Sequence, residues 1–428
     1  MDILIFYEHK ARELNNACLL KYELEQRGYR VKITSLYNIT TPYLIQPIFF
    51  SKPKVVIVPW LYSSDEVKKI KNMFRNADFK LINLQCEQVI SEKWIKSGYF
   101  FPKGEAQKFL HICWGSKIED RLIEFGLEKK NLLTLGAVST DYDQTKFQAL
   151  MMKKEEIAKQ YKLDYNKKWS LFISSFTYTT LTDEELSELY RRTQAEPDEF
   201  KDTMQITKKK ILGWIVQFLE EDKDTIFIYR PHPGERDDKF IIELSEKYNN
   251  FFVINELSVS QWILVSDYIN TWFSTSTADS YFLKKAFAIL RPYTIPEFLD
   301  SELLIDVPYI KDYESFRKFN KGEYISESIL FNKRINLYYK YKDEDYVYIR
   351  LCDVIEDLLN QNDDSFKLHA EKKGRIKYCM SIICYLTFYF RISRVFNTKK
   401  NILEDFEKEN YKSNSYIEEY CNKLRLLL

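Results

Sequence analysis

The sequence is poor in glycine and lacks the glycine-rich motifs that cradle phosphate groups. Only 10 of its 428 residues are glycine, and it contains neither GxxxxGK followed by Ser or Thr nor a GxGxxG segment after the first strand-like run. Nucleotide sites built on those motifs need glycine where the backbone approaches a phosphate. The P-loop and the dinucleotide-binding fingerprint are therefore excluded.

An excess of charge of one sign is also missing. The chain has 64 Lys and Arg residues against 63 Asp and Glu residues. Such a balance creates no global field that would favour nucleic acid as a partner. Any anion that the protein binds must be held by local groups, and we expect no nucleic-acid partner.

Paired cysteines and clustered metal ligands are absent as well. The seven cysteines include no CxxC pair, and no secretory leader precedes the strand-like run Ile3 to Tyr7, which indicates reduced thiols in the cytoplasm. The four histidines are scattered, and the nearest approach to a DxD metal signature, Asp141 to Asp143, lies in a polar connection. We expect a linker turn there, with no bound metal and no cofactor.

The sequence also has no long hydrophobic run. Its longest apolar stretch, 378–390, is too short to span a bilayer as a helix. The wider segment 375–394 combines this stretch with flanking Lys and Arg residues. Two interpretations fit it: a helix lying in a membrane interface, or a helix packed against the N-terminal domain.

The residues that are present indicate an α/β protein. Hydrophobic residues make up 45% and charged residues 30%, a soluble globular composition in a chain long enough for two domains. In the first third, short apolar runs alternate with stretches of helical spacing, which predicts a parallel, doubly wound sheet. The predicted strands are 3–7, 30–34, 55–59, 80–84, 109–114 and 132–135, and the predicted helices are 12–26, 64–76 and 118–125.

A second alternating series follows a polar, lysine-rich connection after Gly136. Its predicted strands are 170–174, 225–229, 251–254, 268–271 and 287–290, and its predicted helices are 207–219 and 238–248. We therefore predict Rossmann-like domains at 1–140 and 169–335, a linker at 141–168 with one helix near 153–161, and a helical C-terminal extension at 336–428. Two such domains face each other across a cleft, which residues following the strands should line.

One segment of the second domain has the chemistry of a phosphate site. The strand-like run Thr225 to Tyr229 leads directly into Arg230-Pro231-His232-Pro233-Gly234-Glu235. A guanidinium offers a planar fork to phosphate oxygens, an imidazole donates one more hydrogen bond, and the prolines stiffen the turn. The alternative is a proline-rich turn with a surface arginine and a structural histidine.

A hydroxyl-rich run supplies a second candidate group. Ser274, Thr275, Ser276 and Thr277 follow the strand that ends near Thr271 and precede a helical run. Hydroxyls and free amides at a helix N-terminus form an anion site, although a simple N-cap would explain one of these residues.

Other polar residues would line the same pocket. Ser174 and Ser175 end the first strand of the second domain, where a serine pair is also ordinary turn chemistry. Asp279 and Glu235 are candidates for contact with a ribose or sugar hydroxyl. For Asp279 the alternative is a favourable interaction with the helix dipole.

The N-terminal half offers two acidic residues that follow strands. Glu87 comes after the strand-like run 80–84, and a carboxylate there could deprotonate a hydroxyl as a general base. Glu8, directly after the first strand, is the rival, although Glu8 and Arg12 have the four-residue spacing of a helical ion pair.

These features together resemble a known family, the bacterial surface carbohydrate biosynthesis proteins. Its members are GT-B-type glycosyltransferases related to capsule Kdo transferases, bacterial polysialyltransferases and CDP-glycerol glycerophosphotransferases. The resemblance covers about residues 1–300 and is carried by Tyr7 to Glu13, Glu87-Gln88, Trp114-Gly115, Gly136, Asp141, Arg230 to Pro233, Ser274 to Thr277 and Lys285 to Pro292.

The resemblance implies roles for several residues. In relatives with CMP- or CDP-linked donors, the histidine of the His-Pro pair and the Ser/Thr turn hold the donor phosphate, and an acid of the N-terminal domain is the base. Carried over, His232 and Ser274 to Ser276 would bind phosphate, and Glu87 would be the base. Polysialyltransferases have paired acids followed by glycine at the base, so the Cys86-Glu87-Gln88 segment departs from their pattern.

The implied activity is an inverting, metal-independent transfer from a nucleotide-activated sugar to a saccharide or lipid-linked saccharide. The favoured donor is a CMP-linked ulosonic acid of the Kdo or sialic type, used in the cytoplasm or at the inner face of the cytoplasmic membrane. The alternatives are a CDP-glycerol or CDP-ribitol phosphotransferase, a UDP-sugar 2-epimerase, and a non-catalytic capsule assembly protein.

Overall fold

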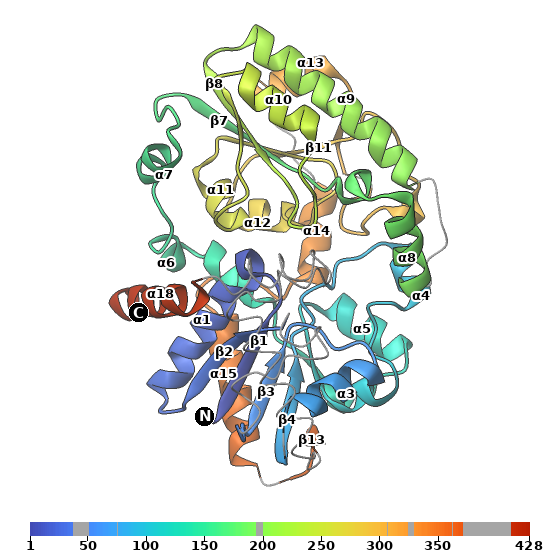
Figure 1. Ribbon diagram of the computed structural model, residues 1–428, viewed down its shortest axis with the longest axis vertical. Helices are drawn as coiled ribbons and strands as arrows, with labels where there is room; N and C mark the ends of the chain where they lie inside the picture. The colour runs from blue at the N-terminus through green and yellow to red at the C-terminus, as the bar shows by residue number, and fades with distance from the viewer. Residues whose placement is uncertain are drawn as a thin grey trace, which may run out of the picture. The chain divides into compact units, whose positions relative to one another are not determined.

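The chain forms two compact units, each built on its own parallel sheet (Figure 1). The computed structural model describes residues 1–36, 51–74, 76–193, 200–305, 307–323, 329–361, 363–370 and 412–428. Unit 1 comprises Met1–Gln88, Phe100–Asp141 and Tyr339–Leu428, and unit 2 comprises Val89–Tyr99 and Tyr142–Tyr338.

The sheet of unit 1 has the strand order β2-β1-β3-β4-β5-β6, with all of these strands parallel. Its central strands β1 and β3 are continuous apolar runs, as expected where helices cover both faces of a sheet. The order reverses between β1 and β3, which makes their carboxyl ends a topological switch point. The strands are β1 (Ile3–Tyr7), β2 (Val31–Ser35), β3 (Val55–Val58), β4 (Ala77–Asn83), β5 (Leu110–Cys113) and β6 (Leu132–Thr134).

Helices pack on the sheet of unit 1 through alternating side chains. Leu4, Val56 and Phe79 share one buried cluster with residues of α3 (Ser64–Met73), whose first turn is fixed by a Ser63/Glu66 capping box. The helices α1 (Lys10–Gln26) and α15 (Val347–Asn360) also pack on the sheet and on each other. The remaining helical elements of this unit are η1 (Gly104–Lys108), α5 (Ser116–Glu124), η2 (Lys129–Asn131) and α18 (Ser413–Leu427), and η3 (Val138–Asp143) spans the boundary to unit 2.

The C-terminal extension completes unit 1 and is not wholly helical. Its helices α15 and α18 pack on α1, whereas β13 (Lys367–Ala370) pairs antiparallel with the first half of β4. The second half of β4 pairs with β5, so β13 fills an edge that β5 leaves open. Alternating burial, with Leu368 and Ala370 buried, explains why this short segment is a strand.

Asp141 and Gly136 fix the return of the chain to unit 1. The Asp141 side chain is fully buried and accepts the backbone N–H groups of Val347 at 2.9 Å and Tyr348 at 2.8 Å, at the start of α15. Gly136 has φ +110°, and a Cβ there would lie 2.7 Å from the Lys340 carbonyl oxygen. The DxD-like segment, which was expected to form a linker turn, therefore contains a structural anchor.

The sheet of unit 2 has the strand order β9-β8-β7-β10-β11-β12, again all parallel. This is the order of a dinucleotide-binding Rossmann sheet, with its switch point between β7 and β10. The strands are β7 (Lys168–Ile173), β8 (Thr225–Arg230), β9 (Phe251–Val253), β10 (Tyr268–Thr271), β11 (Phe287–Leu290) and β12 (Tyr309–Ile310).

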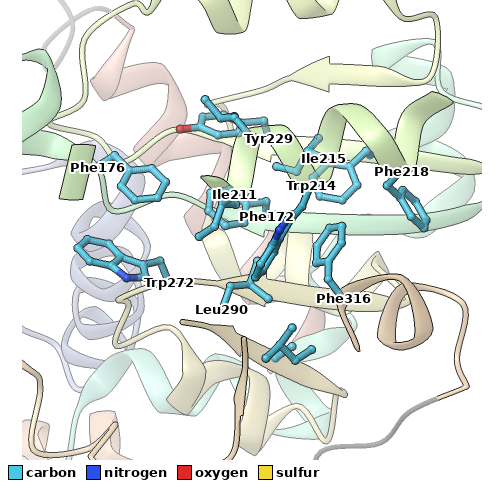
Figure 2. Close-up of a cluster of buried hydrophobic side chains, with 14 of the residues drawn as sticks. Phe172, Phe176, Ile211, Trp214, Ile215, Phe218, Tyr229, Trp272, Leu290 and Phe316 are labelled. Atoms are coloured by element: carbon cyan, nitrogen blue, oxygen red, sulfur yellow. The ribbon is translucent and has the colours of Figure 1, made fainter. Parts of the chain in front are cut away.

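Two aromatic-rich cores cover the two faces of this sheet. Phe172 and Tyr229 point into one core, which α9 (Phe200–Glu221), α10 (Lys239–Lys247) and α13 (Tyr313–Asn320) complete (Figure 2). The alternate strand residues enter the other core, with α7 (Lys154–Tyr161) and α11 (Val259–Val265). The other helical elements are α4 (Glu92–Ser97), α6 (Thr145–Gln148), η4 (Thr177–Thr180), α8 (Asp183–Thr193), α12 (Thr277–Phe282), η5 (Glu297–Leu299) and α14 (Ile329–Tyr338).

The boundaries between the two units lie at other positions than the domain boundaries predicted from the sequence. The expected linker 141–168 supplies α7, whose Ile157 and Ala158 are buried in a core of unit 2. The segment Val89–Tyr99 also belongs to unit 2, where Ser91 bridges to Ser301 and Trp94 packs beside Tyr190. Interleaved segments of this kind leave no local signal in the sequence.

The segment 375–394 lies outside the described residues. Among the described helices, none is both long and apolar enough to cross a membrane.

Replacement of Asp141 by Ala should destabilise unit 1. The change leaves two buried N–H groups of α15 without their acceptor, which costs about 1–3 kcal/mol in the free energy of unfolding. Thermal unfolding should therefore begin at a lower temperature than in the wild type. The exposed Asp120→Ala on α5 is the control, and equal midpoints for the two variants would contradict the anchoring role.

Candidate functional site

Three of the predicted segments lie at the carboxyl ends of neighbouring strands in unit 2. Ile173 of β7 is in register with Arg230 of β8 on one side and with Thr271 of β10 on the other. Ser174 and Ser175 follow β7, the His232 segment follows β8, and Ser274 to Thr277 follow β10. Ligands of open α/β sheets bind at this edge, next to the switch point.

The loop after β8 presents His232 as a hydrogen-bond donor. Its ring is exposed, and the backbone N–H of Gly234 donates to Nδ1 at 3.0 Å. The neutral imidazole therefore carries its proton on Nε2. A tight turn, in which Glu235 N–H donates to the His232 carbonyl at 2.8 Å, holds the ring in place.

Glu235 anchors this loop from the inside. Its side chain is only 1% exposed, and its Oε1 accepts the Tyr229 hydroxyl at 2.8 Å with Lys208 Nζ at 3.5 Å. Its Oε2 accepts the Ser174 hydroxyl at 2.5 Å and the His232 backbone N–H at 3.4 Å. Glu235 and Ser174, both expected at a ligand, are thus placed in a buried network beneath the loop.

Arg230 makes its described contacts with the backbone. The residue is 7% exposed, and its guanidinium donates to the carbonyl oxygens of Glu256 at 2.8 Å and Leu257 at 2.5 Å. Burial lowers its pKa to about 10. Leu257 has a left-handed conformation, φ +63°, and Arg230 ties this strained position to β8.

The hydroxyl-rich run forms a self-supporting turn. Ser274 Oγ accepts the N–H of Ser276, and Thr277 Oγ1 donates to the carbonyl oxygen of Ser274, both at 3.1 Å. The helix that follows was expected to extend to Lys285 and ends at Phe282, because Lys284 is left-handed with φ +55°. Thr275 is exposed at the tip of this turn.

The side chains of Asp279 and Ser175 differ in whether they have a hydrogen-bond partner. Asp279 accepts the Ser260 hydroxyl of α11 at 3.1 Å, and burial raises its pKa to about 6. Ser175 Oγ is buried and has no hydrogen-bond partner among the described residues. A buried hydroxyl without a partner is costly, and among the predicted site residues only Ser175 has a buried side-chain oxygen that lacks a partner among the described residues.

In unit 1 the two rival acids lie in one cluster. Arg12 donates to Glu8 at 3.0 Å and to Glu87 at 2.7 Å, and its Nε donates to Glu13 at 2.8 Å. Burial raises the pKa of Glu8, and the charges of Glu13 and Glu87 add to the effect against those of His9 and Arg12. Glu8 and Glu87 were predicted as alternative bases, and Glu13 was not predicted; its signal in the sequence is a charge next to the apolar stripe of α1.

Aromatic side chains follow β3, at the same end of the parallel sheet as Glu8 after β1 and Glu87 after β4. Trp60 and Tyr62 stack with ring centroids 6.1 Å apart at 11°, and Phe100 meets Tyr62 edge-on at 5.8 Å. Burial raises the pKa of Tyr62, with a further contribution from the Glu87 charge. These rings were not predicted as site residues, because a strand followed by Pro59-Trp60 carries no periodic signal.

The described residues include no group of three or more His, Cys, Asp or Glu side chains placed to hold a metal ion.

Comparison with solved structures identifies the fold. A Staphylococcus aureus MnaA co-structure with UDP has a TM-score of 0.51 at 12% identity, covering 87% of this chain and all of MnaA. The H444N variant of the wall teichoic acid polymerase TagF has a TM-score of 0.51 at 11% identity, covering 84% of this chain and 89% of the other. The chain has the GT-B fold. The predicted fold class, two Rossmann-like domains of GT-B type, is therefore confirmed.

A further similar structure is the UDP-GlcNAc 2-epimerase of Methanocaldococcus jannaschii in complex with UDP-GlcNAc and UDP, with a TM-score of 0.48 at 12% identity, covering 83% of this chain and all of the other. No family model matches the sequence, and no curated protein matches it either. Likeness at such low identity establishes the fold alone, and function has to be argued from the sites.

Replacement of Glu235 by Ala should loosen the loop that carries His232. Tyr229 and Ser174 would lose their shared acceptor in a buried place, at a cost of about 2–3 kcal/mol in the free energy of unfolding. Thermal denaturation would show a lowered midpoint, and Glu235→Gln, which keeps an acceptor oxygen, would show a smaller loss. The exposed Glu243→Ala on α10 is the control, and a Glu235→Ala protein as stable as this control would refute the anchoring role.

Proposed function

We propose that the protein is an inverting, metal-independent glycosyltransferase that uses a nucleotide-activated sugar to build a bacterial surface polysaccharide. The observation that carries the proposal is the edge of unit 2 beside its switch point. There the exposed residue His232, whose Nδ1 accepts the Gly234 N–H and leaves the proton on Nε2, and the buried Ser175 hydroxyl, which has no partner among the described residues, follow adjacent strands. The similar MnaA structure holds UDP, which supports a nucleotide ligand for this fold.

The donor phosphate would be held by preorganised hydrogen bonds. His232 Nε2, the Ser175 hydroxyl and the turn Ser274 to Ser276 offer donors, and buried Arg230 adds a positive charge behind them. As the bond between the anomeric carbon and the phosphate oxygen breaks, the phosphate takes the electron pair. Donors fixed before the reaction stabilise that charge without the cost of reorganising solvent.

The acceptor hydroxyl would be activated by an acid of unit 1. In this scheme Glu87 takes the proton while the acceptor oxygen attacks the anomeric carbon from the face opposite the leaving phosphate, which inverts the configuration. Glu8, joined to the same Arg12, is the alternative base. The acceptor is a saccharide or a lipid-linked saccharide, and in the second case the enzyme would work at the inner face of the cytoplasmic membrane.

We favour a CMP-linked ulosonic acid of the Kdo or sialic type as the donor. Its carboxylate would give the hydroxyl-rich turn a second anionic group to bind. The second candidate is transfer of glycerol or ribitol phosphate from a CDP-linked donor, which the likeness to a wall teichoic acid polymerase favours.

Nucleotides should discriminate between these donors in a thermal shift experiment. A ligand that binds the native state raises the unfolding midpoint by mass action. CMP, CDP, UDP and GDP are compared at equal concentration, and we expect CMP to give the largest shift. A larger shift with CDP would favour the polyol donor, and stabilisation by UDP alone would rule out the CMP donor and favour epimerase chemistry.

Replacement of His232 by Ala should impair turnover. Loss of one preorganised donor to the leaving group costs about 10²–10³ in kcat. Steady-state transfer rates of the variant with its best donor provide the measurement, and His369→Ala, an exposed histidine of unit 1, is the matched control. A His232→Ala enzyme with wild-type kcat would remove His232 from the phosphate site.

A further inference from the structure

Arg12 is the centre of the acidic cluster in unit 1. Its guanidinium uses Nε and one terminal nitrogen on Glu13, its other terminal nitrogen on Glu87, and contacts Glu8 as well. An arginine presents a rigid, planar fork, so these bonds fix the carboxylates relative to one another. Glu8 directly follows β1 at its switch-point end, Arg12 lies in α1, and Glu87 follows β4.

The bond from Arg12 engages only one oxygen of Glu87. Arg12 Nη1 donates to Oε1 at 2.7 Å, and Oε2 has no hydrogen-bond partner among the described residues. The Glu87 side chain is 45% exposed, so without this bond its three rotatable bonds would leave the carboxylate mobile. Arg12 thus selects one orientation and leaves one oxygen with its lone pairs available.

Glu13 balances the charge of Arg12. Its side chain is 5% exposed, Oε1 lies 2.7 Å from Arg12, and Oε2 accepts the backbone N–H of Glu8 at 2.6 Å. A guanidinium in this partly buried place is costly unless its charge is paired. A buried counter-charge on the same helix offsets that cost and keeps the arginine in place.

We propose that Arg12 is the positioning residue that orients the Glu87 carboxylate toward the acceptor hydroxyl, with Glu13 as its counter-charge. This inference rests on the proposed transferase function and adds two residues to it. Among the described residues, the other titratable groups that face the cluster are His9 at the N-cap of α1, Cys86 beside Glu87, and Tyr62 after β3.

The test uses Arg12→Met, Arg12→Lys and Glu13→Gln in the full-length protein. Arg12→Met should lower kcat by about 10- to 100-fold, part of what a general base contributes, while KM for the donor changes less than about twofold. Removal of the positive charge should move the acid limb of the pH–kcat profile to higher pH. Removal of the Glu13 charge in Glu13→Gln should move that limb to lower pH. The two variants thus shift the profile in opposite directions, which a loss of stability would not do.

Charge and geometry can be separated within the same series. Arg12→Lys keeps the charge but not the fork, so it should restore the acid limb and recover little of kcat. Added guanidinium ion, at a concentration that leaves the wild type unaffected, should rescue Arg12→Met and not Arg12→Lys.

Arg27 provides the matched control. It follows α1 at the other end and joins the acids Glu23, Asp353 and Glu356, so Arg27→Met also removes an arginine that bridges three carboxylates. We expect it to lower the unfolding midpoint with no change in the pH profile. Arg12→Met with an unchanged profile, or a profile change shared with Arg27→Met, would overturn the positioning role and leave the transferase function standing. A wild type that binds nucleotide and transfers no sugar would overturn both.

Discussion

The buried carboxylate of Glu235 holds together the edge of unit 2 on which the proposed phosphate site depends. It accepts hydrogen bonds from a residue after β7, from a residue within β8 and from the loop after β8, with Lys208 as the adjacent cation. Because Ser174, Tyr229 and Lys208 are buried, these three partners cannot replace Glu235 by water without a loss of stability. The loop is therefore rigid where a flexible one would have to be ordered by the ligand.

The two units use the same architectural position for opposite chemistry. In each, polar side chains gather at the carboxyl ends of strands next to a reversal of strand order. Unit 2 places donors there, namely an imidazole N–H and hydroxyls, which suit a phosphate. Unit 1 places three carboxylates around one arginine, which suits the removal of a proton. The total charge of the chain nearly cancels, so a charged ligand would be attracted by such local groups and not by a net charge of the whole protein.

Much of this architecture could be predicted from the sequence, because parallel strands buried on both faces are continuous apolar runs. Each strand predicted in the two series is present, with ends displaced by a few residues. The short strands β12 and β13 were missed, and both lie beyond the two alternating series in which the other strands were predicted. The interleaving of 89–99 and 142–168 into unit 2 depends on contacts distant in sequence, which local patterns do not encode.

The positions of the candidate residues in the fold could be predicted, and their contacts less well. His232, Ser175 and Glu87 do follow strands, as their places in the sequence indicated, and their roles stay predictions. It could not show that Glu235 and Ser174 lie in a buried network or that Arg230 holds the carbonyl oxygens of 256 and 257, because side-chain direction is set by packing.

The most direct test of the account is a crystal structure of the protein with CMP. The account predicts the nucleotide phosphate at the carboxyl end of β7 and β8, with hydrogen bonds from His232 Nε2 and the Ser175 hydroxyl. A phosphate bound away from both residues, or a nucleotide seated in unit 1, would contradict it.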